Sequence, residues 1–458
     1  MTAADQQAAR ATGLDLRLST TSNGCTSSIA AFYCDYVLRH LLADPSLGET
    51  EAERRALVYE GGLTIRTPLR LGHQAAADDA VAEAVDPTDD AIGGLAMVEP
   101  GTGDVLAVAQ SRPMGDDVDD GETYLNYTIP QRLGDSAGFQ AGSTFKASVL
   151  AAAIEQGVPL SWGIDSPARI SVPQSTFTDC GGERYSASAP WEPGNLSESD
   201  SGFMTLVTGT RLSVNTFYAQ LTQRTGLCAP YELARSMGVE LDNPTGVEEA
   251  SGLAERVPSF SLGVANVSPV EMAEAYATFA ARGTHCSARP VTAIADAAGN
   301  VLKEYAPRCE RVMQPETADA VNEVLSGVID GGFASAQDLG IDAAGKTGTT
   351  QSARSVWFVG YTPDLATSAM VAGANELGSP VPLDGVRVGG ATVTGASASR
   401  YAAPMWGDAM RGVRGTLSGT AFVPSDPASL RAAVGPTRLQ GSVPLDAPGG
   451  PPDPRVRR

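Results

Sequence analysis

Three short motifs carry the residue types that acyl-transfer chemistry needs, and the first is Ser143-Thr144-Phe145-Lys146. This motif follows a glycine-containing loop and begins a helix predicted over Ser143–Gln156. A serine and a lysine three positions apart lie on one helix face, and the helix start offers unpaired N–H groups to an oxyanion. A neutral lysine amine can take the proton of a hydroxyl that attacks a carbonyl. Alone, the pattern is equally typical of a capping serine beside a solvated lysine.

The second motif is Ser213-Val214-Asn215, and the third is Lys346-Thr347-Gly348-Thr349. In the second, a hydroxyl and a carboxamide can relay a proton to a leaving amine and hold a substrate amide. In the third, glycine allows backbone to approach a ligand, and an edge strand can pair with an extended peptide. Its lysine and hydroxyls suit a terminal carboxylate. Taken singly, the two motifs are also typical of a polar loop and of a β-turn.

Lysine usage supports reading the motifs together. Of 32 basic residues only Lys146, Lys303 and Lys346 are lysines, and two of these three lie in the motifs. Arginine stays charged in proteins, whereas a desolvated lysine can lose its proton and act as a base. In this order the motifs are the set found in penicillin-binding proteins and class A β-lactamases.

The elements that must position these motifs follow a mixed α/β pattern. Apolar runs predict two β-hairpins, over Ile92–Val98 with Val105–Ala109 and over Val356–Tyr361 with Ala366–Val371. Besides Ser143–Gln156, apolar spacing, composition and capping signals predict helices over Ile29–Leu42, Thr50–Tyr59, Gln74–Val85 and Ser268–Phe279. Because the hairpins lie near both ends of the chain, we expect one α/β domain whose sheet is closed by its N- and C-terminal portions.

Over roughly residues 25–420 the chain resembles the transpeptidase portion of class A (bifunctional) penicillin-binding proteins of actinobacterial type. Besides the motifs, the likeness lies in Gly61–Ile65, Glu99–Gly103, Gly138–Gly142, Ser261–Gly263, Ser268–Ala273 and Trp357–Pro363. The resemblance implies an α/β (α+β) transpeptidase fold shared with serine β-lactamases, in which helices sandwich an antiparallel sheet. We expect an N-terminal linker region over 1–85, the transpeptidase domain over 86–421 and a disordered Pro/Gly-rich tail over 422–458.

The resemblance also assigns roles to the motif residues. Ser143 would be the nucleophile, Lys146 its general base, and Ser213 with Lys346 the proton relay to the leaving group. The substrate-binding residues would be Asn215, Thr347, Gly348 and Thr349, of which Asn215 holds the substrate amide and the two threonines bind the terminal carboxylate. The N–H groups of Ser143 and Thr349 would form the oxyanion hole. The resemblance implies no cofactor and no metal.

The implied reaction is cross-linking of peptidoglycan stem peptides. A D-Ala-D-Ala donor acylates Ser143, D-alanine leaves, and the acyl group passes to an amine of a neighbouring strand, while β-lactams such as penicillin acylate the same serine. A β-lactamase is disfavoured because the nearest deacylating glutamate, Glu192, precedes the Ser-x-Asn motif instead of following it. A D,D-carboxypeptidase and a non-catalytic β-lactam or muropeptide sensor remain open. The histidines, His40, His73 and His285, stand in no triad-like context, so structural roles are favoured.

Composition and cysteines bear on compartment and partners. A net charge of −21 argues against nucleic acid as a partner. Six cysteines without Cys-x-x-Cys spacing allow 15 disulfide pairings, and sequence proximity favours Cys25–Cys34, Cys286–Cys309 and Cys180–Cys228; six free cysteines are the alternative. Disulfides would require an extracytoplasmic location, at the outer face of the membrane or in the cell wall.

Bifunctional members of the family carry a glycosyltransferase domain and a membrane anchor upstream, and this sequence contains neither. Three origins stay open, namely a fragment, an unusual start site or a natural loss. An upstream or separate glycosyltransferase and other cell-wall synthesis proteins are therefore possible partners under the resemblance.

Overall fold

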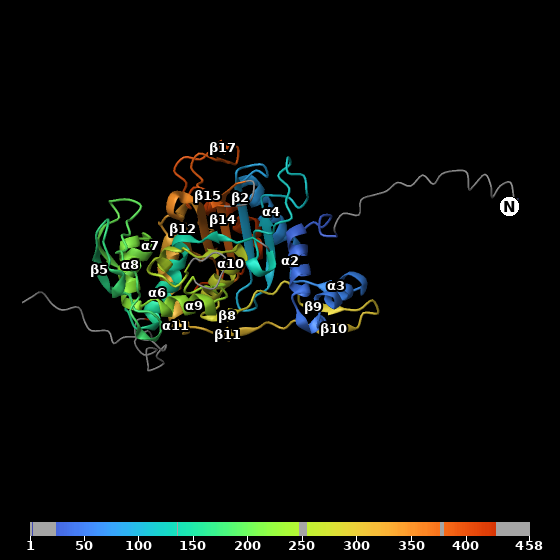
Figure 1. Cartoon of the computed structure of the whole chain (residues 1–458), viewed down its shortest axis with the longest axis horizontal. Coiled ribbons are helices and arrows are strands. Elements are labelled where there is room, and N and C mark those ends of the chain that lie inside the picture. Colours follow the sequence, from blue (N-terminus) through green and yellow to red (C-terminus); the bar gives the residue numbers. More distant parts are fainter. Residues whose placement is uncertain (1, 3–23, 135, 247–253, 376–379, 427–458) are drawn as a thin grey trace, which may run out of the picture.

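A six-stranded antiparallel sheet forms the centre of the computed structural model, which describes residues 2, 24–134, 136–246, 254–375 and 380–426 (Figure 1). The strand order is β3-β2-β14-β13-β12, and β15 pairs with the end of β14. The strands are β2 (Ala91–Val98), β3 (Val105–Gln110), β12 (Ala344–Thr349), β13 (Ser355–Tyr361), β14 (Ala366–Ala374) and β15 (Pro380–Val381). The antiparallel pairing of β2 with β14 confirms that an early hairpin and a late hairpin close one sheet.

Helices cover both faces of this sheet. On one face lie α4 (Leu71–Ala84) and α12 (Ala402–Val413), and on the other lie α10 (Pro269–Ala280) and α11 (Pro315–Ile329). Side chains of β13 alternate between the two faces, so that Val356 and Phe358 join the core under α12, whereas Trp357 and Val359 join the core on the α10 face. Burial on both faces explains why the strands read as continuous apolar runs.

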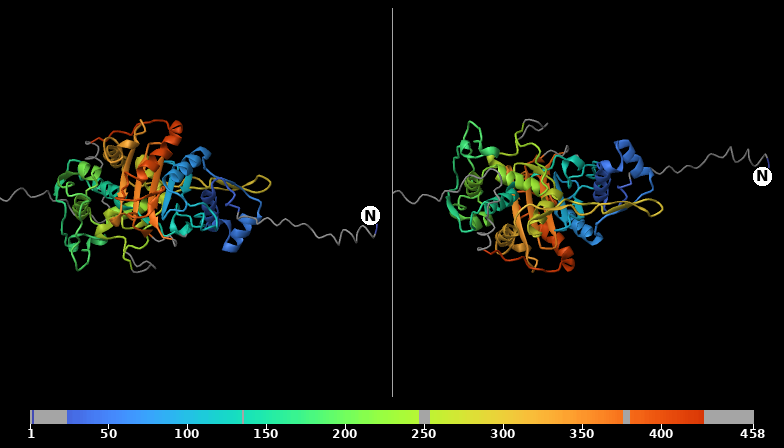
Figure 2. Two further views of the ribbon diagram at one scale, coloured as in Figure 1. Left: turned by 90° about the horizontal axis from the view of Figure 1, so that it is seen from above. Right: turned by 90° about the horizontal axis from the view of Figure 1, so that it is seen from below.

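A mostly helical lobe holds the first two motifs and lies at one end of the molecule, opposite the N-terminal region (Figure 2). It contains η2 (Gly142–Phe145), α6 (Lys146–Glu155), α7 (Leu206–Arg211), α8 (Asn215–Thr225), α9 (Cys228–Ser236) and the hairpin of β5 (Gly163–Ser166) with β6 (Gly202–Thr205). Nine of the ten α6 residues are buried, because alanines and small apolar residues allow neighbouring helices to approach on every side.

The N-terminal region packs at the other end beside a long hairpin (Figure 2). It consists of α2 (Ala31–Leu42), η1 (Pro45–Leu47), α3 (Glu51–Glu60) and β1 (Thr64–Arg66), and β1 pairs with β9 (Ala293–Ala295), which pairs with β10 (Val301–Glu304). A capping box formed by Thr50 and Glu53 begins α3, in the region where the sequence predicts a helix. Within the described residues no helix combines the length and apolarity that a membrane crossing requires.

Short elements complete the described chain. The remaining strands are β4 (Phe139–Gln140), β7 (Asn266–Val267), β8 (Thr284–Cys286), β11 (Cys309–Arg311), β16 (Arg387–Val388) and β17 (Ala391–Thr392). The remaining helices are α5 (Gln131–Gly134), η3 (Gln174–Thr176), η4 (Cys180–Gly182), η5 (Pro258–Leu262), η6 (Ser335–Gln337), η7 (Gln351–Ala353) and η8 (Arg414–Thr416).

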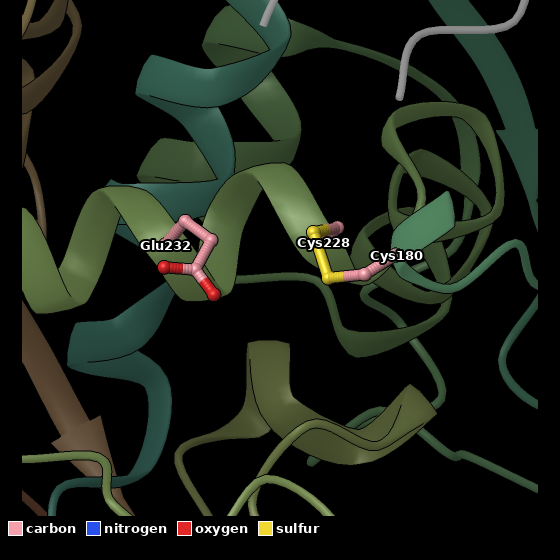
Figure 3. A group of neighbouring side chains, drawn as sticks. All are labelled: Cys180, Cys228 and Glu232. Atoms are coloured by element: carbon pink, nitrogen blue, oxygen red, sulfur yellow. A yellow bond between two sulfur atoms is a disulfide. The ribbon is translucent and has the colours of Figure 1, made fainter. Parts of the chain in front are cut away.

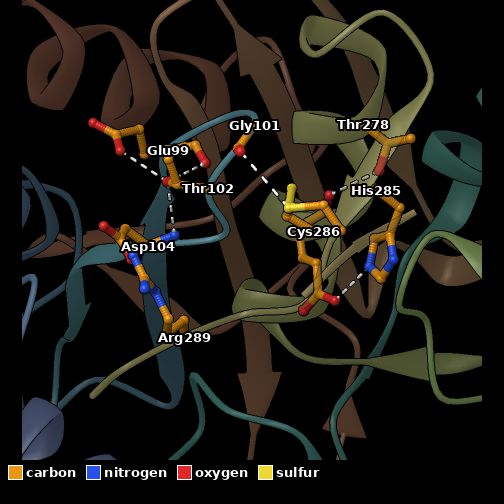
Figure 4. Close-up of a disulfide and its surroundings, with 10 residues drawn as sticks. Glu99, Gly101, Thr102, Asp104, Thr278, His285, Cys286 and Arg289 are labelled. Carbon is orange, nitrogen blue, oxygen red and sulfur yellow. Dashed lines mark hydrogen bonds and ion pairs between the residues drawn. A yellow bond between two sulfur atoms is a disulfide. The ribbon is translucent and has the colours of Figure 1, made fainter. Parts of the chain in front are cut away.

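All six cysteines form disulfides in the three pairs that sequence proximity favours: Cys25–Cys34, Cys180–Cys228 and Cys286–Cys309. The pairing is therefore confirmed. Cys286–Cys309 joins β8 to β11 beside the loop at Gly101, and the buried His285 next to it contacts Glu274 at 2.7 Å (Figure 4).

Packing at both ends of the predicted transpeptidase domain bears on its boundaries. Helix α4 falls in the predicted linker region 1–85, yet its Gln74 side chain bonds Val108 O (2.8 Å) and N (3.2 Å) in β3. This packing favours a boundary earlier than residue 85. The predicted tail begins at Phe422, whose ring instead packs 5.6 Å from that of Tyr361. The tail's residues 427–458 lie outside the described residues.

Candidate active site

Ser143 lies in η2, the tight turn that leads into α6. Gly142 before it has φ +59°, and a Cβ there would stand 2.8 Å from the Thr349 nitrogen in β12. The backbone just before Ser143 can therefore contact the edge strand because residue 142 has no side chain. Ser143 is half-buried, and its hydroxyl makes no hydrogen bond within the described part of the chain. The predicted single helix over Ser143–Gln156 is thus a 3₁₀ turn followed by α6.

Lys146 begins α6 and is fully buried. Its Nζ lies 2.6 Å from the Ser213 carbonyl, 2.7 Å from Asn215 Oδ1 and 3.3 Å from Ser213 Oγ. Burial lowers the pKa of Lys146 well below its usual value, and the charge of Lys346 lowers it further. A neutral amine has two N–H donors, which the two short contacts satisfy, and one lone pair that remains to accept a proton.

Ser213 connects the two buried lysines. Its Oγ lies 2.7 Å from Lys346 Nζ and 3.3 Å from Lys146 Nζ. The backbone of Ser213 has φ +57°, a conformation that is strained for a residue with a side chain. Lys346 is also fully buried, and burial lowers its pKa to about 7. The hydroxyl predicted to relay protons thus stands between two amines whose pKa values burial lowers.

The carboxamide of Asn215 is held on both sides. Its Oδ1 accepts from Lys146, and its Nδ2 donates to Gly194 O at 2.8 Å. The next residue along the same segment, Asn195, accepts from the Thr216 N–H at 3.0 Å. Asn215 was expected to hold a substrate amide, and in this structure its amide group positions Lys146. Sequence reasoning missed Gly194 because nothing in the spacing connects it to residue 215.

Thr347, Gly348 and Thr349 lie in β12, which is an edge strand of the sheet, as the sequence predicts. A Cβ on Gly348 would stand 2.3 Å from Ala141 O, so glycine is needed where the strand passes the turn before Ser143. Lys346 points away from Thr349's face and donates to Thr347 O at 3.0 Å.

A cavity of about 260 Å³ joins the three motifs. Ser143, Ser213, Thr347 and Thr349 line it, whereas Lys146, Asn215, Lys346 and Gly348 are not among its lining residues. The lining also includes residues that sequence reasoning did not find: Asn195, Leu196, Asp200, Leu212, Val214, Phe333 and the segment Ser397–Ser399. Leu212 and Val214 flank Ser213, whereas the others come from loops distant in sequence, whose lengths and residue types carry no signal of a shared cavity.

A larger cavity, of about 850 Å³, contains no residue of the three motifs. It lies between Trp191 and the turn at Pro258, and the acidic and basic residues that line it are Arg132, Glu240, Asp242, Glu255 and Glu271. The smaller cavity is therefore the candidate active site, because Ser143, the serine predicted to be the nucleophile, lines it.

One group of potential metal ligands occurs in the described part of the chain, namely Cys180, Cys228 and Glu232 (Figure 3). The two sulfur atoms are bonded to each other, so neither can act as a thiolate ligand. The histidines also have other surroundings. His285 contacts Glu274, and burial lowers the pKa of His40 to about 4. None of the three histidines lines the candidate active site.

A half-buried serine beside two buried lysines, at the edge of an antiparallel sheet, is the arrangement of enzymes that form an acyl-enzyme on serine with lysine as the base. The family model of the penicillin binding protein transpeptidase domain matches residues 93–381. This match covers more than half of the chain, so the chain belongs to the penicillin-binding protein transpeptidase family.

Known relatives agree with this assignment. "Penicillin-binding protein 1A" of Aquifex aeolicus is 29 % identical over 273 residues, which are 59 % of this chain and 33 % of the relative. The protein of the same name from Neisseria meningitidis is 30 % identical over 280 residues, 59 % of this chain and 31 % of the relative. The chain thus matches about a third of these relatives' length.

Among solved structures, PonA1 from Mycobacterium tuberculosis in complex with penicillin V superposes with a TM-score of 0.65 at 24 % identity. The match covers 86 % of this chain and 96 % of that chain. It confirms the predicted fold, in which helices sandwich an antiparallel sheet.

Proposed function

We propose that the chain is a serine D-alanyl-D-alanine transpeptidase that cross-links peptidoglycan stem peptides through an acyl-enzyme on Ser143. The observation that carries the proposal is the pair of buried lysines on either side of Ser213, next to a serine that opens into a cavity. Family membership supports serine acyl transfer in general, and the contacts of Ser213 with both lysines support its role as a proton relay.

In the first half-reaction, Ser143 Oγ attacks the carbonyl carbon of the penultimate D-alanine, and its proton passes to neutral Lys146. The N–H groups of Ser143 and Thr349 stabilise the oxyanion. The close approach of the two backbone segments at Gly142 and Thr349 supports this pairing of donors. Thr347 and Thr349 hold the terminal carboxylate. When the C–N bond breaks, the leaving amine takes a proton through Ser213, and D-alanine departs.

In the second half-reaction, an acceptor amine attacks the ester carbon, the C–O bond breaks, and Ser143 Oγ regains its proton through Lys146. A β-lactam acylates Ser143 in the same way. Its leaving nitrogen stays attached to the acyl group, so no fragment departs from the ester. The three disulfides support an extracytoplasmic site of action, since such bonds form and persist in oxidising compartments.

Labelling with a fluorescent penicillin tests the nucleophile. Wild type should be labelled, and Ser143→Ala should not. Lys146→Arg should fold normally by circular dichroism yet lose labelling, because an arginine does not become neutral. Labelling of Ser143→Ala equal to wild type would refute the assignment.

Product analysis then tests the reaction. The purified chain, given a donor peptide ending in D-Ala-D-Ala and an amine acceptor, should release D-alanine and form the cross-linked amide. A hydrolysis product alone would establish a D,D-carboxypeptidase, and labelling without either product would favour a sensor.

A further inference from the structure

Asp200 is the only ionisable side chain among the described residues that line the cavity beside Ser143. Both active-site lysines lie behind the cavity wall, bonded to Ser213. Asp200 is half-buried, and within the described part of the chain its carboxylate makes no hydrogen bond or ion pair. The reaction steps derived above give this carboxylate no role.

The loop that carries Asp200 is hydrogen-bonded to the start of α8. The Asn195 side chain donates through Nδ2 to Asp200 O and accepts through Oδ1 from the Thr216 N–H, in the first turn of α8. The Asp200 N–H donates to Ser197 O at 3.1 Å. The loop is thus attached to the helix turn that holds Asn215, so the backbone of Asp200 is held beside the cavity.

Apolar side chains line the same cavity as this carboxylate. Leu196, Leu212 and Phe333 line the same cavity, and they are 84 %, 42 % and 45 % exposed. Exposed apolar surface at the mouth of a polar cavity is stabilised when an aliphatic group covers it. A negative charge beside such surface fits a ligand that carries an ammonium group on an aliphatic arm.

We propose that Asp200 binds the ammonium group of the acceptor in the second half-reaction, with the acceptor's aliphatic arm against Leu196. This assignment rests on the proposed transpeptidase function and names its acceptor as a primary amine on an alkyl chain. The bound ammonium releases one proton to solvent before attack. Its nitrogen then forms the amide bond, the Ser143 ester bond breaks, and the second proton passes through Lys146 to Ser143 Oγ. Asp200 remains a carboxylate throughout.

The test measures how the acyl-enzyme partitions between transfer and hydrolysis. The full chain is given a D-Ala-D-Ala donor peptide with Nα-acetyl-lysinamide or glycinamide as the acceptor. Asp200→Asn keeps the shape and removes the charge. Glu198→Gln is the matched control, because it removes one charge from the same loop at an exposed position outside the cavity.

We expect Asp200→Asn to raise the KM for both acceptors about fivefold to tenfold and to lower the transfer-to-hydrolysis ratio. Glu198→Gln should behave as wild type. Added salt should raise the acceptor KM of wild type more than that of Asp200→Asn, because salt screens the charge pair. Leu196→Ser should raise the KM for Nα-acetyl-lysinamide more than that for glycinamide.

Three results would overturn the assignment. An unchanged acceptor KM in Asp200→Asn would remove Asp200 from acceptor binding, while wild-type transfer would leave the proposed function standing. An equal rise of the acceptor KM in Glu198→Gln would show that the effect comes from the net charge of the loop and not from Asp200 itself. A selective loss of hydrolysis in Asp200→Asn would make this carboxylate the base for water. Absence of transfer in wild type would instead refute the transpeptidase function itself, and the acceptor role of Asp200 with it.

Discussion

Replacing Asn215 with aspartate should inactivate the enzyme through the pKa of Lys146. In the structure Asn215 Oδ1 lies 2.7 Å from Lys146 Nζ, and Lys146 is fully buried. Asn215→Asp places a carboxylate at this contact with almost no change in shape. The carboxylate stabilises the ammonium form, and its second oxygen faces Gly194 O, to which the amide now donates at 2.8 Å. The first effect draws a proton onto Lys146, whereas the second favours a protonated carboxyl at residue 215 and reduces the shift.

The magnitude follows from the contact distance. An opposite charge within hydrogen-bond reach raises the pKa of a lysine by about one to three units. Below the new pKa, each unit lowers the neutral fraction of Lys146 about tenfold. At a pH below the wild-type pKa of Lys146, acylation by penicillin should therefore fall by about one to three orders of magnitude. The variant should also need a correspondingly more alkaline pH for full activity.

The assay is the rate of fluorescent-penicillin labelling as a function of pH. For Asn215→Asp the acidic limb of the profile should move to higher pH by about one to three units. Asn215→Ala is the control, since it removes the same contact without adding charge. An unshifted limb in Asn215→Asp, or an equal shift in Asn215→Ala, would show that a neutral Lys146 is not the base.

Three further predictions concern stability and packing. The folded chain releases the Lys346 proton near pH 7, whereas the unfolded chain keeps it to the ordinary pKa of 10.5. The unfolded state binds more protons between these values, so stability should rise with pH there, by about 1.4 kcal/mol per unit for this group. Urea unfolding of wild type and Lys346→Met at several pH values should show this rise in wild type alone. A difference in unfolding free energy between the two that does not vary with pH would contradict the burial of this amine. Gly263→Ala should reduce labelling and lower Tm, because the new Cβ would stand 1.9 Å from Gly142 O at φ +69°. Gly299→Ala, at φ +87° in open space, is the control, and equal losses in the two variants would exclude a steric cause. Replacing Cys180 and Cys228 together by serine should cost about 2–4 kcal/mol of unfolding free energy, more than the same change at Cys25 and Cys34, because the closed loop is longer, 48 against 9 residues. Equal denaturation midpoints for the two pairs would argue against the loop-length explanation.

The parts of the fold and site that the sequence predicts are those with local signals. The capping box at Ser268, the apolar hairpin strands and the two hydroxyl–lysine motifs each lie within a few residues of chain, so propensity and spacing predict them. The edge position of Lys346–Thr349 followed from its place before a predicted hairpin. Sequence proximity also predicted the disulfides, because short loops close with the least entropy cost.

The parts that the sequence does not predict depend on contacts between distant segments. The left-handed backbone of Ser213, the bond from Asn215 to Gly194 and the position of Asp200 arise only when the loops at 191–200 fold against α8. No spacing or composition in those loops differs from that of a solvated turn. The packing of α4 against β3, which brings part of the predicted linker region onto the sheet, was missed for the same reason.

The pairing of β2 with β14 limits how far this chain can be shortened. A fragment that starts at Phe139 would keep all three motifs and every residue of the active-site cavity. It would also end the sheet at β14, whose nine residues are all buried, and leave that strand's backbone groups without partners. A long, flat, apolar edge of this kind pairs readily with other chains. Aggregation of such a fragment would therefore reflect a missing neighbour strand, and supplying residues 91–110 as a separate peptide should restore its solubility.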